Sequence, residues 1–216
     1  MTAQERVRKL GSLSLRRWIL EGLSEQHDPL ASMPVPYTHD IRWTGSEIHT
    51  EARFKAYKSF MSFHSGEKVL DVGEMSPMTK KLADYYNFHV QSTKDGIDLN
   101  FGFDAPSQEY DVVLCLEVIE HIMNPAYLMS EIYSRLRPGG RLYLSTPLLG
   151  LWGILHDGTH FTEYKEKNIE VLAEYVGFKP VGRKAYPLFP WWWSFTGVRP
   201  MVRNLFHRCA VYEFVK

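Results

Sequence analysis

Cysteine, net charge and long apolar runs are all scarce in this sequence of 216 residues. Only two cysteines occur, Cys115 and Cys209, and neither belongs to a CxxC pair, so neither a zinc site nor a disulfide framework is expected. The 25 Lys and Arg residues balance the 25 Asp and Glu residues, which leaves no electrostatic footprint for nucleic acid. No run approaches the roughly 18 apolar residues of a membrane span, and the first residues lack a secretory signal. We therefore expect a cytoplasmic protein with no nucleic-acid partner.

Glycine is also missing from a place where a nucleotide-binding turn usually has it. The stretch "VLDVGEMSP", residues 69–77, begins as an apolar strand and reaches glycine, but Met75 and Pro77 then stand where further glycines are usual. Proline suits the first position of the following helix, with Ser76 as its N-cap. Met75 fits such a turn only if its φ is negative.

The order of the expected elements predicts the fold class. Residues 1–27 have helical periodicity, 27–40 contain three prolines, and 46–63 have a second helical pattern. From residue 68 onward, apolar strand patterns alternate with helical ones, as in a parallel sheet covered on both faces. We predict an α/β fold with a Rossmann-like, doubly wound, mostly parallel sheet, an antiparallel C-terminal edge strand and an N-terminal helical segment. The expected division is a helical cap at 1–60 and a main domain at 61–216 with an aromatic insertion at 186–208.

Acidic residues and histidines follow the predicted strands. In an open α/β sheet, ligands bind beyond the carboxyl ends of the strands, where the strand order reverses. The residues at these ends include Gly73 and Glu74 after the first strand, and Glu117 and His121 after the third. The lysine and serine of a P-loop are absent, so phosphoryl transfer is not expected.

Four blocks of the sequence, in this order, resemble a known family. "VLDVG", then "IDL", then "YDVVLCLEVIEHIMNP", then "LRPGGRLYLSTP" are similar to the signature blocks of class I S-adenosylmethionine-dependent methyltransferases, above all the branch that methylates quinones and glycans. The resemblance covers roughly residues 66–182, and "THFTEY" resembles the family's substrate-side loop. It implies S-adenosylmethionine as cofactor and a small, lipidic or sugar-containing acceptor. The residues that it implies for the cofactor are Asp71, Gly73, Glu74, Met75, Asp98, Leu99, Leu116 and Glu117, and those facing the substrate are His121 and His160.

Two departures from the family pattern keep a second function open. Met75 and Pro77 replace glycines, and no acid occupies 91–93, where the family holds the cofactor ribose; Asp95 reaches that place only if the turn is longer than usual. The alternative is a catalytically silent methyltransferase-like protein that serves as a binding or scaffold module. A nicotinamide-dependent oxidoreductase is disfavoured because the G-x-G-x-x-G pattern is absent.

The histidines allow more than one interpretation. A histidine with a pKa near neutrality suits a general base for a hydroxyl acceptor, but His121 also suits a buttress for the segment after the third strand. His156 and His160 are four residues apart in "HDGTH", yet a third ligand at matching spacing is lacking, so no metal is expected.

The segment 186–208 mixes aromatic rings with arginines. Trp191, Trp192 and Trp193 are consecutive, and three arginines follow. This composition suits a peripheral membrane contact, a lid over an apolar substrate, a dimer contact, or a cover for the sheet edge. The sequence does not decide between them, and it leaves the oligomeric state open.

Overall fold

The computed structural model describes residues 47–93, 97–105, 110–149, 160–187, 191–198, 201 and 208–216. The helix expected at 1–27, the proline-rich segment, Asp95 and His156 lie outside the described residues. None of the helices described is both long and apolar enough to cross a membrane. The domain boundary expected at residue 60 stays a prediction.

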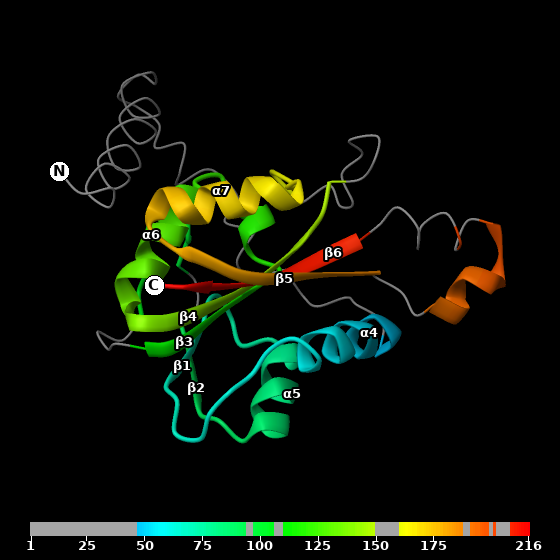
Figure 1. Ribbon diagram of the computed structural model, residues 1–216, viewed down its shortest axis with the longest axis horizontal. Coiled ribbons are helices and arrows are strands. Elements are labelled where there is room, and N and C mark those ends of the chain that lie inside the picture. Colours follow the sequence, from blue (N-terminus) through cyan, green and yellow to red (C-terminus); the bar gives the residue numbers. More distant parts are fainter. Residues whose placement is uncertain are drawn as a thin grey trace, which may run out of the picture.

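The described residues alternate between helices and strands as expected (Figure 1). In chain order the elements are α4 (Glu47–Lys58), β1 (Val69–Asp71), α5 (Pro77–Tyr86), β2 (Val90–Ser92), β3 (Tyr110–Leu116), the 3₁₀ helix η2 (Ile119–His121), α6 (Pro125–Arg135), β4 (Leu136–Pro147), α7 (Glu166–Val176), β5 (Lys179–Pro187), the 3₁₀ helix η3 (Trp191–Thr196) and β6 (Arg208–Val215).

The strands that the structure describes form one six-stranded sheet in the order β2-β1-β3-β4-β6-β5. Strands β2, β1, β3 and β4 are parallel to one another, and β6 is antiparallel to both β4 and β5. The predicted α/β fold class is confirmed. The position of the antiparallel strand differs from the expectation, because β6 lies one place inside the sheet and β5 forms its edge.

The residues of the two strands explain why β6 is an interior strand and β5 is the edge strand. The side chains of Ala210, Val211, Tyr212 and Phe214 in β6 are fully buried, as suits an interior strand. Strand β5 carries prolines at both ends and exposed basic residues, which discourage pairing at a free edge.

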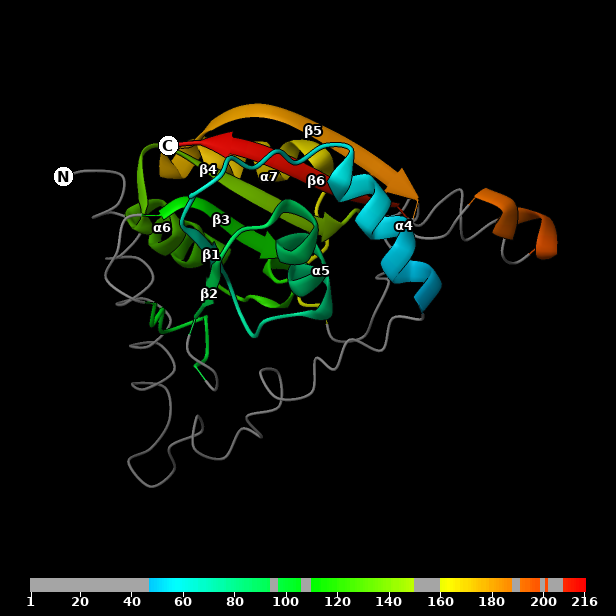
Figure 2. The ribbon, with the colours of Figure 1, turned by 90° about the horizontal axis from the view of Figure 1, so that it is seen from below.

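Helices cover both faces of the sheet, with α6 and α7 on one side and α4 and α5 on the other (Figures 1 and 2). The central strand β3 serves both layers, because successive side chains point to opposite faces. Val113 and Cys115 belong to the core beneath α6 and α7, whereas Val112 and Leu114 pack in the core beneath α4 and α5. Cys115 and Cys209 are both buried, and both are free thiols.

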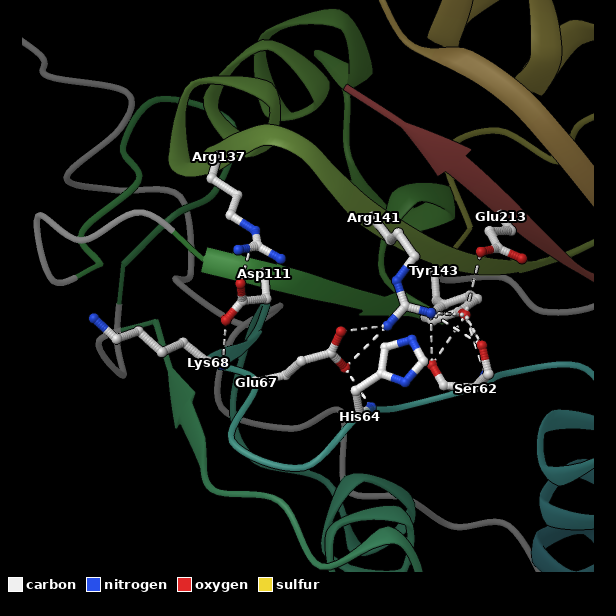
Figure 3. Close-up of polar contacts among 9 residues, drawn as sticks. All are labelled: Ser62, His64, Glu67, Lys68, Asp111, Arg137, Arg141, Tyr143 and Glu213. Atoms are coloured by element: carbon white, nitrogen blue, oxygen red, sulfur yellow. Dashed lines mark hydrogen bonds and ion pairs between the residues drawn. The ribbon is translucent and has the colours of Figure 1, made fainter.

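A polar cluster fastens the segment between α4 and β1 to the sheet, near the amino ends of the parallel strands (Figure 3). Arg141 of β4 donates two hydrogen bonds to Glu67, at 2.7 and 2.9 Å, and a third to the carbonyl of Ser62 at 2.8 Å. The Lys68 N–H donates to Asp111 at 2.7 Å, and Arg137 pairs with the same carboxylate. These contacts lie at the end of the sheet opposite the carboxyl ends of the parallel strands, where ligands of open α/β sheets bind.

Candidate active site

The strand order places the candidate site between β1 and β3. The chain runs from β1 outward to β2 and then returns to β3 on the other side of β1, so the order reverses there. Ligands of open α/β sheets bind at this point, beyond the carboxyl ends of the strands. Since Asp71, the last residue of β1, is in register with Leu114, the turn after β1 lies beside the end of β3.

The turn after β1 is built around Gly73. Its φ of 99° lies in the region that side chains rarely adopt, and an added Cβ would meet only Val118, at 3.9 Å, so backbone conformation rather than space requires glycine. The Thr93 hydroxyl accepts from the Gly73 N–H at 2.9 Å and so holds the turn to the end of β2. Ser76 caps α5 by accepting from the Thr79 N–H at 3.0 Å, and Pro77 is the first helical residue, as the sequence predicts.

The other two residues of this turn fit the geometry. Met75 is not among the described non-glycine residues with positive φ, which meets the condition set by the sequence. Its side chain is half-buried, and that of Glu74 is exposed on the turn. The substitutions of glycine by Met75 and Pro77 therefore leave the turn intact.

Asp71 presents a buried carboxylate at this site. It accepts hydrogen bonds from the Ser76 N–H and the Thr79 side chain, and burial raises its pKa to about 7 against the effect of those bonds. Its second oxygen, Oδ2, is buried and has no hydrogen-bond partner among the described residues. Such an oxygen suits a cationic or N–H donor group of a ligand.

Glu117 continues the chain beyond β3 in a left-handed conformation, with φ of 58°. Its N–H donates to the Ser145 carbonyl at 3.0 Å, and its carboxylate accepts from the Ser145 hydroxyl at 2.8 Å. The other carboxylate oxygen accepts from Arg53 of α4 at 2.9 Å. Leu116, just before it, is half-buried at the end of β3. The sequence located Glu117 at this strand end, but it gave no signal for Arg53 or Ser145.

Asp98 and Leu99 lie in the segment between β2 and β3. The Oδ1 atom of Asp98 accepts from the Asn100 N–H and side-chain amide, at 2.9 and 2.8 Å. Asn100 in turn accepts from the Met123 N–H at 2.6 Å, so this segment is tied to the chain after η2. Asp98 is exposed, whereas Leu99 is buried and belongs to the core beneath α6 and α7.

His121, the last residue of η2, and His160, in the segment between β4 and α7, are brought together. Their ring centroids are 4.9 Å apart at an interplanar angle of 75°. The N–H groups of Phe161 and Thr162 donate to the Glu120 carbonyl at 2.9 and 3.2 Å, which fixes the loop after β4 against η2. The sequence predicted both histidines for the substrate side, and the structure places them in contact.

Two carboxylates accompany these histidines. Glu163 bonds to Nδ1 of His160 at 2.7 Å, which leaves Nε2 as the nitrogen for other partners. Glu120 is buried and accepts from the Thr146 hydroxyl at 3.1 Å. Burial, and after it the nearby charge of Glu117, raises the pKa of Glu120 well above its ordinary value. Glu163 lies within the recognised loop, but its role was not predicted.

Glu120, His121 and His160 also form a set that could hold a metal ion. Each offers one ligand atom, and these atoms all lie within 4.8 Å of one another. The Glu163 carboxylate on His160 is the kind of partner that orients metal-ligating histidines. This grouping joins two residues of η2 to one that lies about 40 residues later, so the sequence spacing did not reveal it.

Comparison with known proteins agrees with the resemblance in the sequence. A family model described as "Methyltransferase domain" matches residues 42–182, more than half of the chain. Ubiquinone biosynthesis O-methyltransferase of Hydrogenovibrio crunogenus is 26% identical over 102 residues, covering 47% of this chain and 39% of that protein. The enzyme of the same name from Proteus mirabilis is 23% identical over 154 residues, covering 66% and 60%. The chain thus spans less than two thirds of the length of these curated relatives.

Solved structures share the fold. Coclaurine N-methyltransferase bound to N-methylheliamine and SAH has a TM-score of 0.60 at 12% identity, covering 99% of this chain and 94% of that one. A SAM-dependent methyltransferase from Archaeoglobus fulgidus has a TM-score of 0.57 at 17% identity, covering 80% and 95%. At these identities the likeness establishes the common fold.

Proposed function

Because the chain belongs to the methyltransferase-domain family, we propose that it is an S-adenosylmethionine-dependent methyltransferase that acts on a small, lipidic or sugar-containing acceptor. The observation that carries the proposal is the buried Oδ2 of Asp71, which lies without a partner among the described residues beside the Gly73 turn. A cofactor with a cationic amino-acid end would supply the missing donor. The names of the curated relatives support oxygen as the methylated atom.

The residues at the switch point fit this cofactor. Asp71 and the turn of Gly73, Glu74 and Met75 would hold its amino-acid end, together with backbone at Leu116 and Glu117. Asp98 would accept from the adenine amine while Leu99 packs against the ring. When bound, the cofactor supplies an activated sulfonium methyl group, so the chain's task is to hold the nucleophile in line with it and to exclude water.

We assign proton removal from a hydroxyl acceptor to His160. Glu163 holds Nδ1 at 2.7 Å, which orients Nε2 and would stabilise the charge that the ring gains with the proton. The His121 ring packs against this ring in a T-shaped arrangement. We also propose a cytoplasmic location, as expected from the sequence. Two cysteines that are buried as free thiols are consistent with a reducing compartment.

Calorimetric titration with S-adenosylhomocysteine tests the cofactor site directly. We expect the wild-type protein to bind with a Kd in the micromolar range that is typical of specific small ligands. Gly73→Val should abolish binding because a β-branched residue opposes the φ of 99°. Asp98→Asn keeps an acceptor for Asn100 but replaces the second carboxylate oxygen with a donor, so it should weaken binding by about ten-fold.

Gly66→Ala is the matched control for a positive-φ glycine away from the site, since Gly66 has a φ of 83° in the segment before β1. It should lower stability without changing affinity. If the folded wild-type protein gives neither heat nor thermal stabilisation at millimolar ligand, the methyltransferase proposal fails and the silent binding module replaces it.

The exposed aromatic residues of η3 favour an additional surface function. Trp191, Trp192 and Phe195 have 74%, 47% and 81% of their surface exposed, and η3 projects from the body of the fold in both ribbon views (Figures 1 and 2). Indole rings suit the headgroup region of a bilayer. We therefore propose a peripheral membrane contact through η3, which would bring the site to a lipidic acceptor.

A further inference from the structure

The ion pair between Arg53 and Glu117 joins the helical segment before the main sheet to the switch point. Arg53 comes from α4 and Glu117 from the residue after β3, and their nitrogen and oxygen atoms are 2.9 Å apart. Both side chains are largely enclosed, with 14% and 11% of their surface exposed. A pair so enclosed is screened little by solvent, unlike an ion pair on the surface.

A chain of hydroxyl groups extends this contact. The Ser145 hydroxyl donates to Glu117, the Tyr57 and Ser145 hydroxyls are 2.7 Å apart, and Tyr186 donates to Tyr57 at 3.2 Å. Because Ser145 gives its proton to Glu117, Tyr57 is the donor to Ser145. Residues of α4, β4 and β5 therefore all direct donors toward one carboxylate.

Glu117 needs such support because its backbone is left-handed, which is unfavourable for a residue with a side chain. The same backbone lies beside the Gly73 turn, where Val118 is the nearest neighbour of an added Cβ at residue 73. Loss of the donors would leave an enclosed carboxylate without compensation, and the turn would relax to bring it to water.

We propose that Arg53 is a positioning residue for the cofactor, which acts by fixing the carboxylate, and thereby the turn, of Glu117. The inference rests on the proposed function. It assigns to α4 a share in cofactor affinity. Arg53 contacts Glu117 directly, and Tyr57 contacts it through Ser145.

The test measures S-adenosylhomocysteine affinity by calorimetry, well below the thermal midpoint of each unliganded variant. Arg53→Met should weaken binding by about ten-fold or more, and Arg53→Lys should restore it to within about three-fold. In a Glu117→Gln background residue 117 carries no negative charge to compensate. There, Arg53→Met should weaken S-adenosylhomocysteine binding by less than about a further two-fold. Lys55→Met is the matched control, because it removes an exposed cation from the same helix.

Wild-type affinity in Arg53→Met with a lowered thermal midpoint would overturn the inference, since Arg53 would then only stabilise the fold. If Arg53→Met does not fold, Tyr57→Phe removes a single hydroxyl from the chain and should still weaken binding by about two- to five-fold. An unchanged Kd in Tyr57→Phe would contradict the inference in that case. Failure of the wild-type protein to bind would instead refute the proposed function itself.

Discussion

At the scale of single residues, Asp71 links the site to pH. Burial raises its pKa to about 7, whereas the same carboxylate titrates near 4 in an unfolded chain. Between these values the folded protein keeps a proton that the unfolded chain has released. The free energy of unfolding therefore falls as pH rises through this window and levels off above about pH 7.

Asp71→Asn should remove this dependence, because asparagine can still accept from Ser76 and Thr79 but does not titrate. From pH 5 to pH 8, we expect the wild-type protein to lose about 2–3 kcal/mol of stability relative to the variant. Urea unfolding of both proteins at the two pH values measures the difference. The raised pKa of Glu120 is common to both and cancels; parallel pH profiles would show that Asp71 is ionised in the folded protein at pH 5.

Variants of His160 and chelation together distinguish a general base at His160 from a metal ion at the site. If His160 is the base, His160→Gln should lower kcat about 100-fold and Glu163→Gln about ten-fold, with Kd for S-adenosylhomocysteine unchanged. Transfer of labelled methyl groups to a panel of phenolic and sugar hydroxyls would supply the rates. Chelation should then have no effect. Loss of activity with EDTA and its recovery with added divalent cation would favour a metal held by Glu120, His121 and His160.

At the scale of elements, the sequence predicted what depends on local pattern. The block "YDVVLCLEVIEHIMNP" contains the apolar run that forms β3, and the structure begins α6 at the end of this block, where Asn124 is the cap. Boundaries were less accurate. Helix α4 ends at Lys58 rather than at residue 63, and β4 begins at Leu136 because the Pro-Gly-Gly stretch joins the strand.

Contacts between distant elements were beyond the reach of pattern. The carboxyl ends of parallel strands gather at one edge, so Gly73, Glu117 and His121 could be placed near one another in advance. The helical pattern of residues 46–63 predicted a helix but not what it packs against. Arg53 was therefore missed, because its partner Glu117 lies 64 residues away in the sequence. The order of β5 and β6 likewise depends on which strand buries more apolar surface against β4.

At the scale of the whole molecule, the proposed membrane contact through η3 can be tested with vesicles. Replacement of Trp191 and Trp192 by serine should reduce cosedimentation with phosphatidylglycerol vesicles by about ten-fold or more, because interfacial indole rings are lost. Val171 and Tyr175 of α7, which are 63% and 51% exposed, provide the matched control when changed to serine. Equal sedimentation of both variants and the wild type would exclude η3 as the membrane contact.

The place of β6 inside the sheet also has a consequence for synthesis on the ribosome. Strand β5 is made before β6, yet it has no strand to pair with until β6 has taken its position beside β4. The nascent chain therefore carries an unpaired β5 and an open edge on β4 while the segment between β5 and β6 is being made. Both edges are exposed to wrong pairing during this interval. We infer that a chaperone which shields strand edges would increase the yield of folded protein more than one that acts only on the parallel half.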